Sequence, residues 1–178
     1  MSNIKSVKFT QENFITRVKM CIDIHFKEEG LSTENIIPIT ISNMTRTMGY
    51  FRWIGDKPLK LNFSHLLLNG AYDLNGVDEI IEHEIAHYML FMNGYHREGH
   101  GHRFKAMCKK HGFRLDGTII KGVKKTAVYD DILAKESKYI IKCDTCGKLF
   151  YKNRISGIVK HPNTYRHDNC PIGMTKIK

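Results

Sequence analysis

The segment "EHEIAHYMLFMNGYHREGHGHRF", residues 82–104, holds five histidines and three glutamates in 23 residues. Apolar residues in and just before it recur at the three- and four-residue spacing of a helix: Val77, Ile80, Ile81, Ile85, Tyr88, Met89 and Met92. This pattern predicts an α-helix over about residues 77–93, with Asn75 as its N-cap and Gly94 as its stop signal. The histidines are therefore expected on one amphipathic helix and in the chain just after it.

The central part of this segment, "HEIAH", has the pattern HExxH, with His83, Glu84 and His87. Positions i and i+4 share one helical face, so both imidazoles can reach one cation. Glu84 is turned by about 100° from His83, so it can stand beside the metal and accept a proton from a water there. Zinc lowers the pKa of such a water towards about 7. The motif therefore predicts a catalytic zinc centre with Glu84 as the general base.

Catalytic zinc usually takes three protein ligands, so a third ligand is expected downstream of the motif. A histidine six residues after His87 would complete the metzincin pattern, but that position is Asn93. His100 is favoured because it lies between Gly99 and Gly101, where the backbone can turn and approach closely. Three other residues nearby remain candidates: His96, His102 and, more weakly, Glu98.

The rest of the first 112 residues predicts helices packed on a short β-sheet, an α+β fold. A first helix is expected after Thr10 as N-cap, with one apolar face: Phe14, Val18, Cys21, Ile22 and Phe26. Two or three strands are expected within residues 36–55 and 59–68, which are rich in Ile, Thr and aromatic residues. A third helix is expected over about 101–111, ending at Gly112.

A second set of metal-ligand residues lies near the C-terminus. Cys143 and Cys146 form a CxxC pair, and His167 and Cys170 form an HxxC pair twenty residues further on. Two such pairs supply four ligands, the closed tetrahedral set of a structural zinc site. The pattern predicts a zinc ribbon, in which His161 is the alternative to His167 as the third ligand. The alternative without zinc is that the cysteines form two unrelated thiol pairs.

The formal net charge of +10 is concentrated in this C-terminal part. Residues 138–178 carry nine Lys or Arg against two Asp or Glu, a net +7. Lysines and arginines interleaved with aromatic residues suit a nucleic-acid surface. The alternatives are a solvated basic face and aromatics that form the small core of the ribbon. No run of about 18 apolar residues predicts a membrane span, and no signal-peptide pattern is visible, so the cytoplasm is the expected location.

These motifs together resemble the SprT family, the family of Spartan-type proteases. The resemblance is carried by "HEIAHYMLF" followed by "REGHGHRF", by "MTRTMGYFRW" and "LKLNFSHLL" upstream, and by the C-terminal cysteines. It covers about residues 10–112 and 139–178. Family ribbons usually have four cysteines, whereas here a histidine takes the third place.

The resemblance implies a zincin-like metalloprotease domain at 1–122, a linker at 123–138 and a zinc ribbon at 139–178. It also implies a catalytic zinc held by His83, His87 and His100, and substrates that are proteins on, or crosslinked to, DNA. The rival hypotheses are a nucleic-acid-binding module whose HExxH centre is structural, and a metal hydrolase that acts on a non-peptide substrate. The oligomeric state is left open.

Overall fold

The structure is a computed structural model that describes residues 6–114 and 125–178. The chain divides into two compact units, residues 1–128 and residues 129–178. Both are mixtures of helices and one small sheet, so the α+β prediction is confirmed. None of the helices in the two described ranges combines the length and the apolar character needed to cross a membrane.

The first unit begins with helix α1, Gln11–Glu28. Thr10 caps it as predicted, because its Oγ1 accepts a hydrogen bond from the Asn13 backbone N–H at 3.1 Å. The predicted apolar face is buried at four positions: Phe14, Val18, Ile22 and Phe26. Cys21 on the same face is only partly buried.

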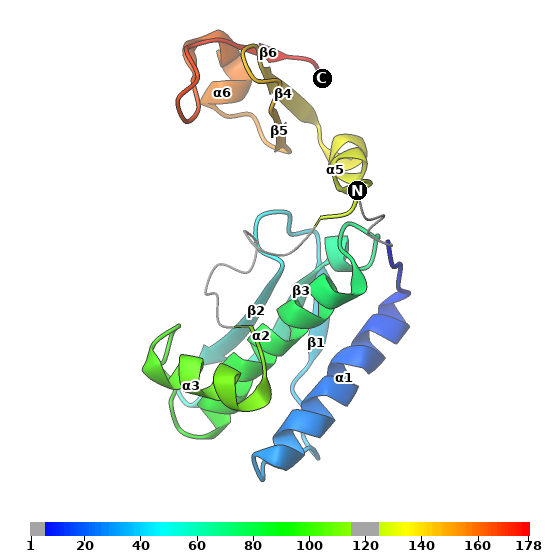
Figure 1. Cartoon of the computed structure of the whole chain (residues 1–178), viewed down its shortest axis with the longest axis vertical. Coiled ribbons are helices and arrows are strands. Elements are labelled where there is room, and N and C mark those ends of the chain that lie inside the picture. The colour runs from blue at the N-terminus through cyan, green and yellow to red at the C-terminus, as the bar shows by residue number, and fades with distance from the viewer. Residues whose placement is uncertain (1–5, 115–124) are drawn as a thin grey trace. The chain divides into compact units, whose positions relative to one another are not determined.

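Three strands follow: β1 (Ile39–Ser42), β2 (Gly49–Ile54) and β3 (Lys57–Ser64). The sheet order is β1-β3-β2, with β1 parallel and β2 antiparallel to β3. Helices α1 and α2 pack side by side over one face of this sheet (Figure 1). This packing brings the edge strand β2 alongside the helix that carries HExxH.

Helix α2 spans Leu74–Met92 and is longer at its start than the periodicity predicted. The predicted N-cap, Asn75, is wrong: Asp73 caps the helix, and its Oδ1 accepts from the Gly76 backbone N–H at 2.8 Å. Leu74 and Asn75 at the start of the helix are exposed, so the buried apolar pattern begins only later and periodicity misplaces the start.

Two shorter helices complete the described part of the first unit. The 3₁₀ helix η1, His65–Leu67, follows β3 directly. Helix α3 spans His102–His111 and ends at Gly112, whose φ of 72° is left-handed, as the C-terminal glycine predicted. Phe104, Met107 and Cys108 form its buried face.

The second unit contains helix α5 (Tyr129–Glu136) and the strands β4 (Tyr139–Cys143), β5 (Leu149–Lys152) and β6 (Met174–Lys176). Its sheet is antiparallel with the order β5-β4-β6. Helix α6 (Gly157–Lys160) and the 3₁₀ helix η2 (Pro162–Thr164) lie between β5 and β6. A small core is formed by Ile141, Val159 and Met174, with Tyr139, Phe150 and Ile158 packed against it.

The predicted domain borders stay predictions. The range 123–138, expected to be a linker, includes helix α5, while its residues 123 and 124 lie outside the described residues. Residues 1–5 and 115–122 of the predicted protease domain also lie outside them.

Candidate metal centres

The first candidate centre, called the His83 site, consists of His83, His87 and His100. His83 and His87 lie one turn apart on α2, and His100 lies in the loop just before α3. The Nε2 atom of His100 is 3.0 Å from Nε2 of His83 and 3.1 Å from Nε2 of His87. The fold therefore brings together the three residues that the sequence predicted as ligands.

Phe104 on α3 holds the three rings in place. Its ring centroid lies 4.9 Å from that of His83, 4.5 Å from that of His87 and 4.9 Å from that of His100. Phe104 itself is fully buried. Such a contact restricts the rotation of all three imidazoles, so their Nε2 atoms stay convergent.

The donor chemistry of the His83 site fits a cation such as zinc. Burial, reinforced by the neighbouring imidazoles, lowers the pKa of His83 to about 3 and that of His87 to about 4, so both rings are neutral. Tautomers with Nε2 unprotonated would present three nitrogen donors to one such ion.

The side chain of Glu84, the residue after His83, contacts strand β2. It is buried, with 7 % of its surface exposed, and its carboxylate accepts a hydrogen bond from the Phe51 backbone N–H. Burial raises its pKa to about 8, and the Phe51 hydrogen bond opposes only part of this shift. Glu84 is therefore a carboxyl group beside the imidazoles that can gain and lose a proton near neutral pH.

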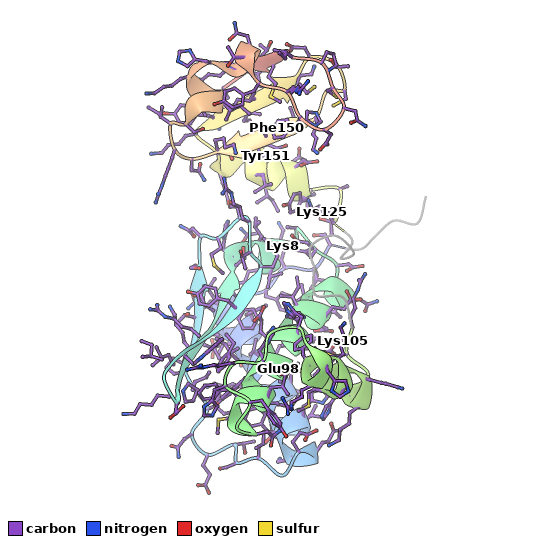
Figure 2. The ribbon with its side chains drawn as sticks, turned by 90° about the vertical axis from the view of Figure 1, so that its left-hand side faces the viewer. Lys8, Glu98, Lys105, Lys125, Phe150 and Tyr151 are labelled. Atoms are coloured by element: carbon purple, nitrogen blue, oxygen red, sulfur yellow. The ribbon has the colours of Figure 1, made fainter. Side chains whose placement is uncertain are left out.

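The other candidate ligands make different contacts. His96 Nδ1 lies 2.8 Å from Asp56 Oδ1, and its ring stacks on Phe91. Glu98, labelled in Figure 2, accepts a hydrogen bond from the Arg103 backbone N–H at 3.1 Å and so caps the first turn of α3. His102 is exposed and is not among the three clustered residues.

Two residues that shape the surroundings of Glu84 were not predicted from the sequence. Gly49 makes room for the Glu84 side chain, and Phe51 supplies the hydrogen bond to its carboxylate. Both lie on β2 and reach Glu84 through tertiary packing. A glycine inside a strand is a general signal of close approach, but it does not say which residue approaches.

The second candidate centre, called the ribbon site, consists of Cys143, Cys146, His167 and Cys170. Their ligand atoms all lie within 4.8 Å of one another, and Cys146 Sγ is 3.1 Å from His167 Nε2. A hydrogen bond with the Cys146 backbone is the main cause that lowers the Cys143 pKa to about 6, which favours the thiolate that binds metal. The set is compatible with a tetrahedral zinc ion.

The histidine of the ribbon site is held by its neighbour. His167 Nδ1 lies 3.0 Å from Asp168 Oδ2, which leaves Nε2 directed at the cysteines. His161, the alternative ligand, lies at the junction of α6 and η2 and is not among the clustered residues.

Comparison with known proteins identifies the family of the chain. The model of the SprT-like family matches residues 18–124, more than half of the 178 residues. The chain belongs to the SprT-like family. Its sequence is 27 % identical over 128 residues to the protein SprT-like of Bacillus velezensis, an alignment that covers 70 % of this chain and 73 % of that relative. The comparison with solved structures gave no match.

The SprT-like match includes the His83 site, Glu84, Gly49 and Phe104. It ends before the ribbon site, so the ribbon rests on its own cluster of ligand atoms. The SprT-like family is associated with metalloprotease-like function, and the prediction of this family from the sequence is confirmed.

Proposed function

We propose that this SprT-like protein is a zinc-dependent peptidase that cleaves proteins bound or crosslinked to DNA. The observation that carries the proposal is the position of Glu84: a buried carboxyl group that follows directly on His83, in a site where three imidazoles converge. A purely structural zinc site has no need of such a base.

Different residues of the site would have different roles in peptide hydrolysis. His83, His87 and His100 would hold the ion. Zinc, when bound, acidifies a water molecule and polarises the substrate carbonyl. Glu84 accepts the proton of the attacking water and passes it to the leaving amine.

The choice of substrate is supported by the charge of the second unit. The net +7 of residues 138–178 includes exposed cations on several of its elements: Lys142, Lys148, Arg154, Lys160 and Arg166. Tyr165 is 41 % exposed and can stack on a base, whereas Tyr139 and Phe150 pack against the ribbon core. Phe150 and Tyr151 follow each other on β5 (Figure 2). Cations with an exposed aromatic ring suit single-stranded or distorted DNA.

The test is cleavage of a basic DNA-binding protein with and without DNA, using the full chain, Glu84→Gln and Glu12→Gln. Glu12 is an exposed glutamate in the first turn of α1 and serves as the matched control. We expect cleavage by the wild type and by Glu12→Gln, more in the presence of DNA, and none by Glu84→Gln. A Glu84→Gln protein that cleaves as fast as the wild type would rule out the proposed chemistry.

The basic ribbon also favours a second candidate, a DNA-binding module without peptidase activity. The same set of proteins separates the two. A wild type that binds DNA and zinc, but cleaves none of a panel of DNA-bound proteins and denatured proteins, would favour the binding module.

A further inference from the structure

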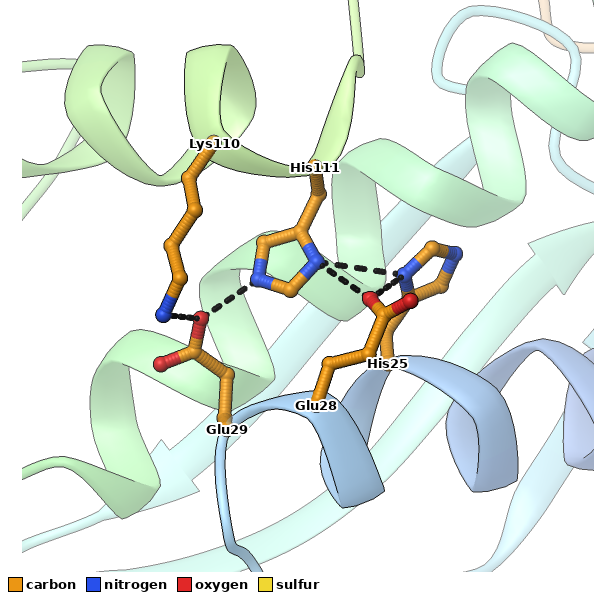
Figure 3. Close-up of polar contacts among 5 residues, drawn as sticks. All are labelled: His25, Glu28, Glu29, Lys110 and His111. Carbon is orange, nitrogen blue, oxygen red and sulfur yellow. Dashed lines mark hydrogen bonds and ion pairs between the residues drawn. The ribbon is translucent and has the colours of Figure 1, made fainter.

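The C-terminal ends of α1 and α3 bring together a third group of ligand residues, which shares no residue with either centre and is called the His111 cluster: His25, Glu28 and His111 (Figure 3). His25 and Glu28 are three residues apart and share one face of α1. His111 is the last residue of α3. The Nδ1 atoms of the two histidines are 3.2 Å apart, and Glu28 Oε2 lies 3.0 Å from His25 Nδ1 and 2.9 Å from His111 Nδ1.

The other nitrogen of His111 contacts a second carboxylate. Nε2 is 2.5 Å from Oε1 of Glu29, and the same oxygen is 2.7 Å from Lys110 Nζ. Nε2 of His111 therefore has a carboxylate partner of its own outside the cluster, and Nδ1 is the ring atom that faces His25 and Glu28.

The three facing atoms of the cluster are all of kinds that bind metals: two imidazole nitrogens and one carboxylate oxygen. Three electron-rich atoms, each pair about 3 Å apart, thus point at a common centre.

We propose that His25 Nδ1, Glu28 Oε2 and His111 Nδ1 bind a divalent transition-metal ion of the zinc class. Bonds of about 2.0–2.1 Å to a tetrahedral ion place its ligand atoms about 3.3 Å apart, close to the separations in the cluster. Two imidazoles and one carboxylate form a ligand set that such ions accept. Glu29 then has the role of the outer carboxylate that orients a metal-bound histidine.

The surroundings of the His111 cluster combine a closed and an open side. The His111 side chain is fully buried and that of His25 is 16 % exposed, whereas that of Glu28 is 53 % exposed. Phe113 packs against both rings, with centroids 4.6 Å from His25 and 5.4 Å from His111. An ion can therefore arrive from solvent on the Glu28 side and keep a water as its fourth ligand.

The bound ion would link the C-terminal end of α3 to that of α1. Helix α3 begins two residues after His100, and it carries Phe104, which packs on all three rings of the His83 site. An ion in the His111 cluster therefore restrains the helix that shapes the His83 site, without contributing a ligand to it. This role does not depend on the proposed peptidase activity.

The test is a zinc titration of the full chain. The zinc that remains after desalting is counted by elemental analysis, and zinc chloride is then added in a calorimeter to the wild type, Glu28→Gln, His25→Gln and Glu12→Gln. We expect three zinc equivalents at saturation in the wild type and in the control Glu12→Gln. We expect two in Glu28→Gln and His25→Gln, together with loss of part of the zinc-dependent rise in unfolding temperature.

Glu28→Gln is the decisive variant, because its exposed side chain can be changed without opening the core. Glu29→Gln should have an intermediate effect: zinc should bind to the His111 cluster about 10–100-fold more weakly, whereas binding at the other two sites should be unchanged. A wild type that saturates at two equivalents, with an isotherm identical to that of Glu28→Gln, would overturn the proposal. The cluster would then be a set of hydrogen bonds around a protonated His111, without a metal ion.

Discussion

The Glu84 side chain lies directly over Gly49: a Cβ added to Gly49 would come within 2.7 Å of Glu84 Cγ and 3.0 Å of its Oε1. Real Cβ atoms do not approach other atoms that closely, so any larger residue at position 49 must displace the glutamate. The strand β2 thus sets the position of the proposed base from outside the HExxH motif.

Gly49→Ala is therefore expected to disable the proposed peptidase without removing its metal. The added methyl group pushes Glu84 out of place, and a displacement of about 1 Å can lower the rate about 100-fold. Overpacking should also lower the free energy of unfolding by about 1–3 kcal/mol. Cleavage rate, zinc content and thermal unfolding are measured together. Full activity in Gly49→Ala would show that the Glu84 position is not critical.

His100→Ala is expected to lose one equivalent of zinc and all peptidase activity, because only two imidazoles would remain in the His83 site. His96→Ala and His102→Ala are the matched controls, since the structure places neither histidine in that cluster. Elemental analysis of the three desalted variants decides between the candidates. Zinc lost from His96→Ala or His102→Ala, but retained in His100→Ala, would reassign the third ligand.

The ribbon site is expected to depend on His167 and not on His161. His167→Ala should lose one zinc, whereas His167→Cys should retain it, because a thiolate restores a four-ligand set. Asp168→Asn should weaken zinc binding about 10–100-fold, since the carboxylate orients His167. Competition with a zinc chelator measures all three effects, and His161→Ala is the control. Equal zinc retention by His167→Ala and the wild type would argue for another ligand.

Removal of metal is expected to divide the five cysteines into two classes. Burial raises the pKa of Cys21 to about 12 and that of Cys108 to about 11, so both remain unreactive thiols in the folded protein. Cys143, Cys146 and Cys170 should be protected by zinc and become alkylated once a chelator is added. Mass spectrometry after brief treatment with iodoacetamide identifies which cysteines are alkylated. Modification of Cys143 at the same rate before and after chelation would contradict zinc binding at the ribbon.

DNA binding is expected to reside in the ribbon and to depend steeply on salt. Replacing Arg154 and Arg166 by alanine should weaken binding to single-stranded DNA and reduce the slope of log affinity against log salt by about 1.4, if each contacts one phosphate. Lys19→Ala and Lys27→Ala on α1 are the charge-matched controls. Fluorescence anisotropy at several salt concentrations provides both values. An unchanged slope in the arginine variant would place the DNA contacts elsewhere.

Much of this protein follows from local sequence patterns. The cap at Thr10, the buried face of α1 and the glycine stop of α3 each depend on residues a few positions apart, and all three were predicted. His83 and His87 share a helical face for the same local reason. Cys143 and Cys146 likewise lie together because they are three residues apart in the chain. The start of α2 was misplaced because Asp73 lies ahead of the apolar pattern that reveals the helix.

Tertiary structure alone decided which distant residues meet. Gly49 lies under Glu84 because β2 packs against α2, and no spacing along the chain encodes that contact. His25 and His111 are 86 residues apart, yet their Nδ1 atoms lie 3.2 Å from each other. Periodicity reports which face of an element is buried, but the partner of that face is selected by the packing of the whole core. The proposed base and its candidate metal motif could therefore be read from the sequence, whereas the strand that positions Glu84 and the third cluster required the fold.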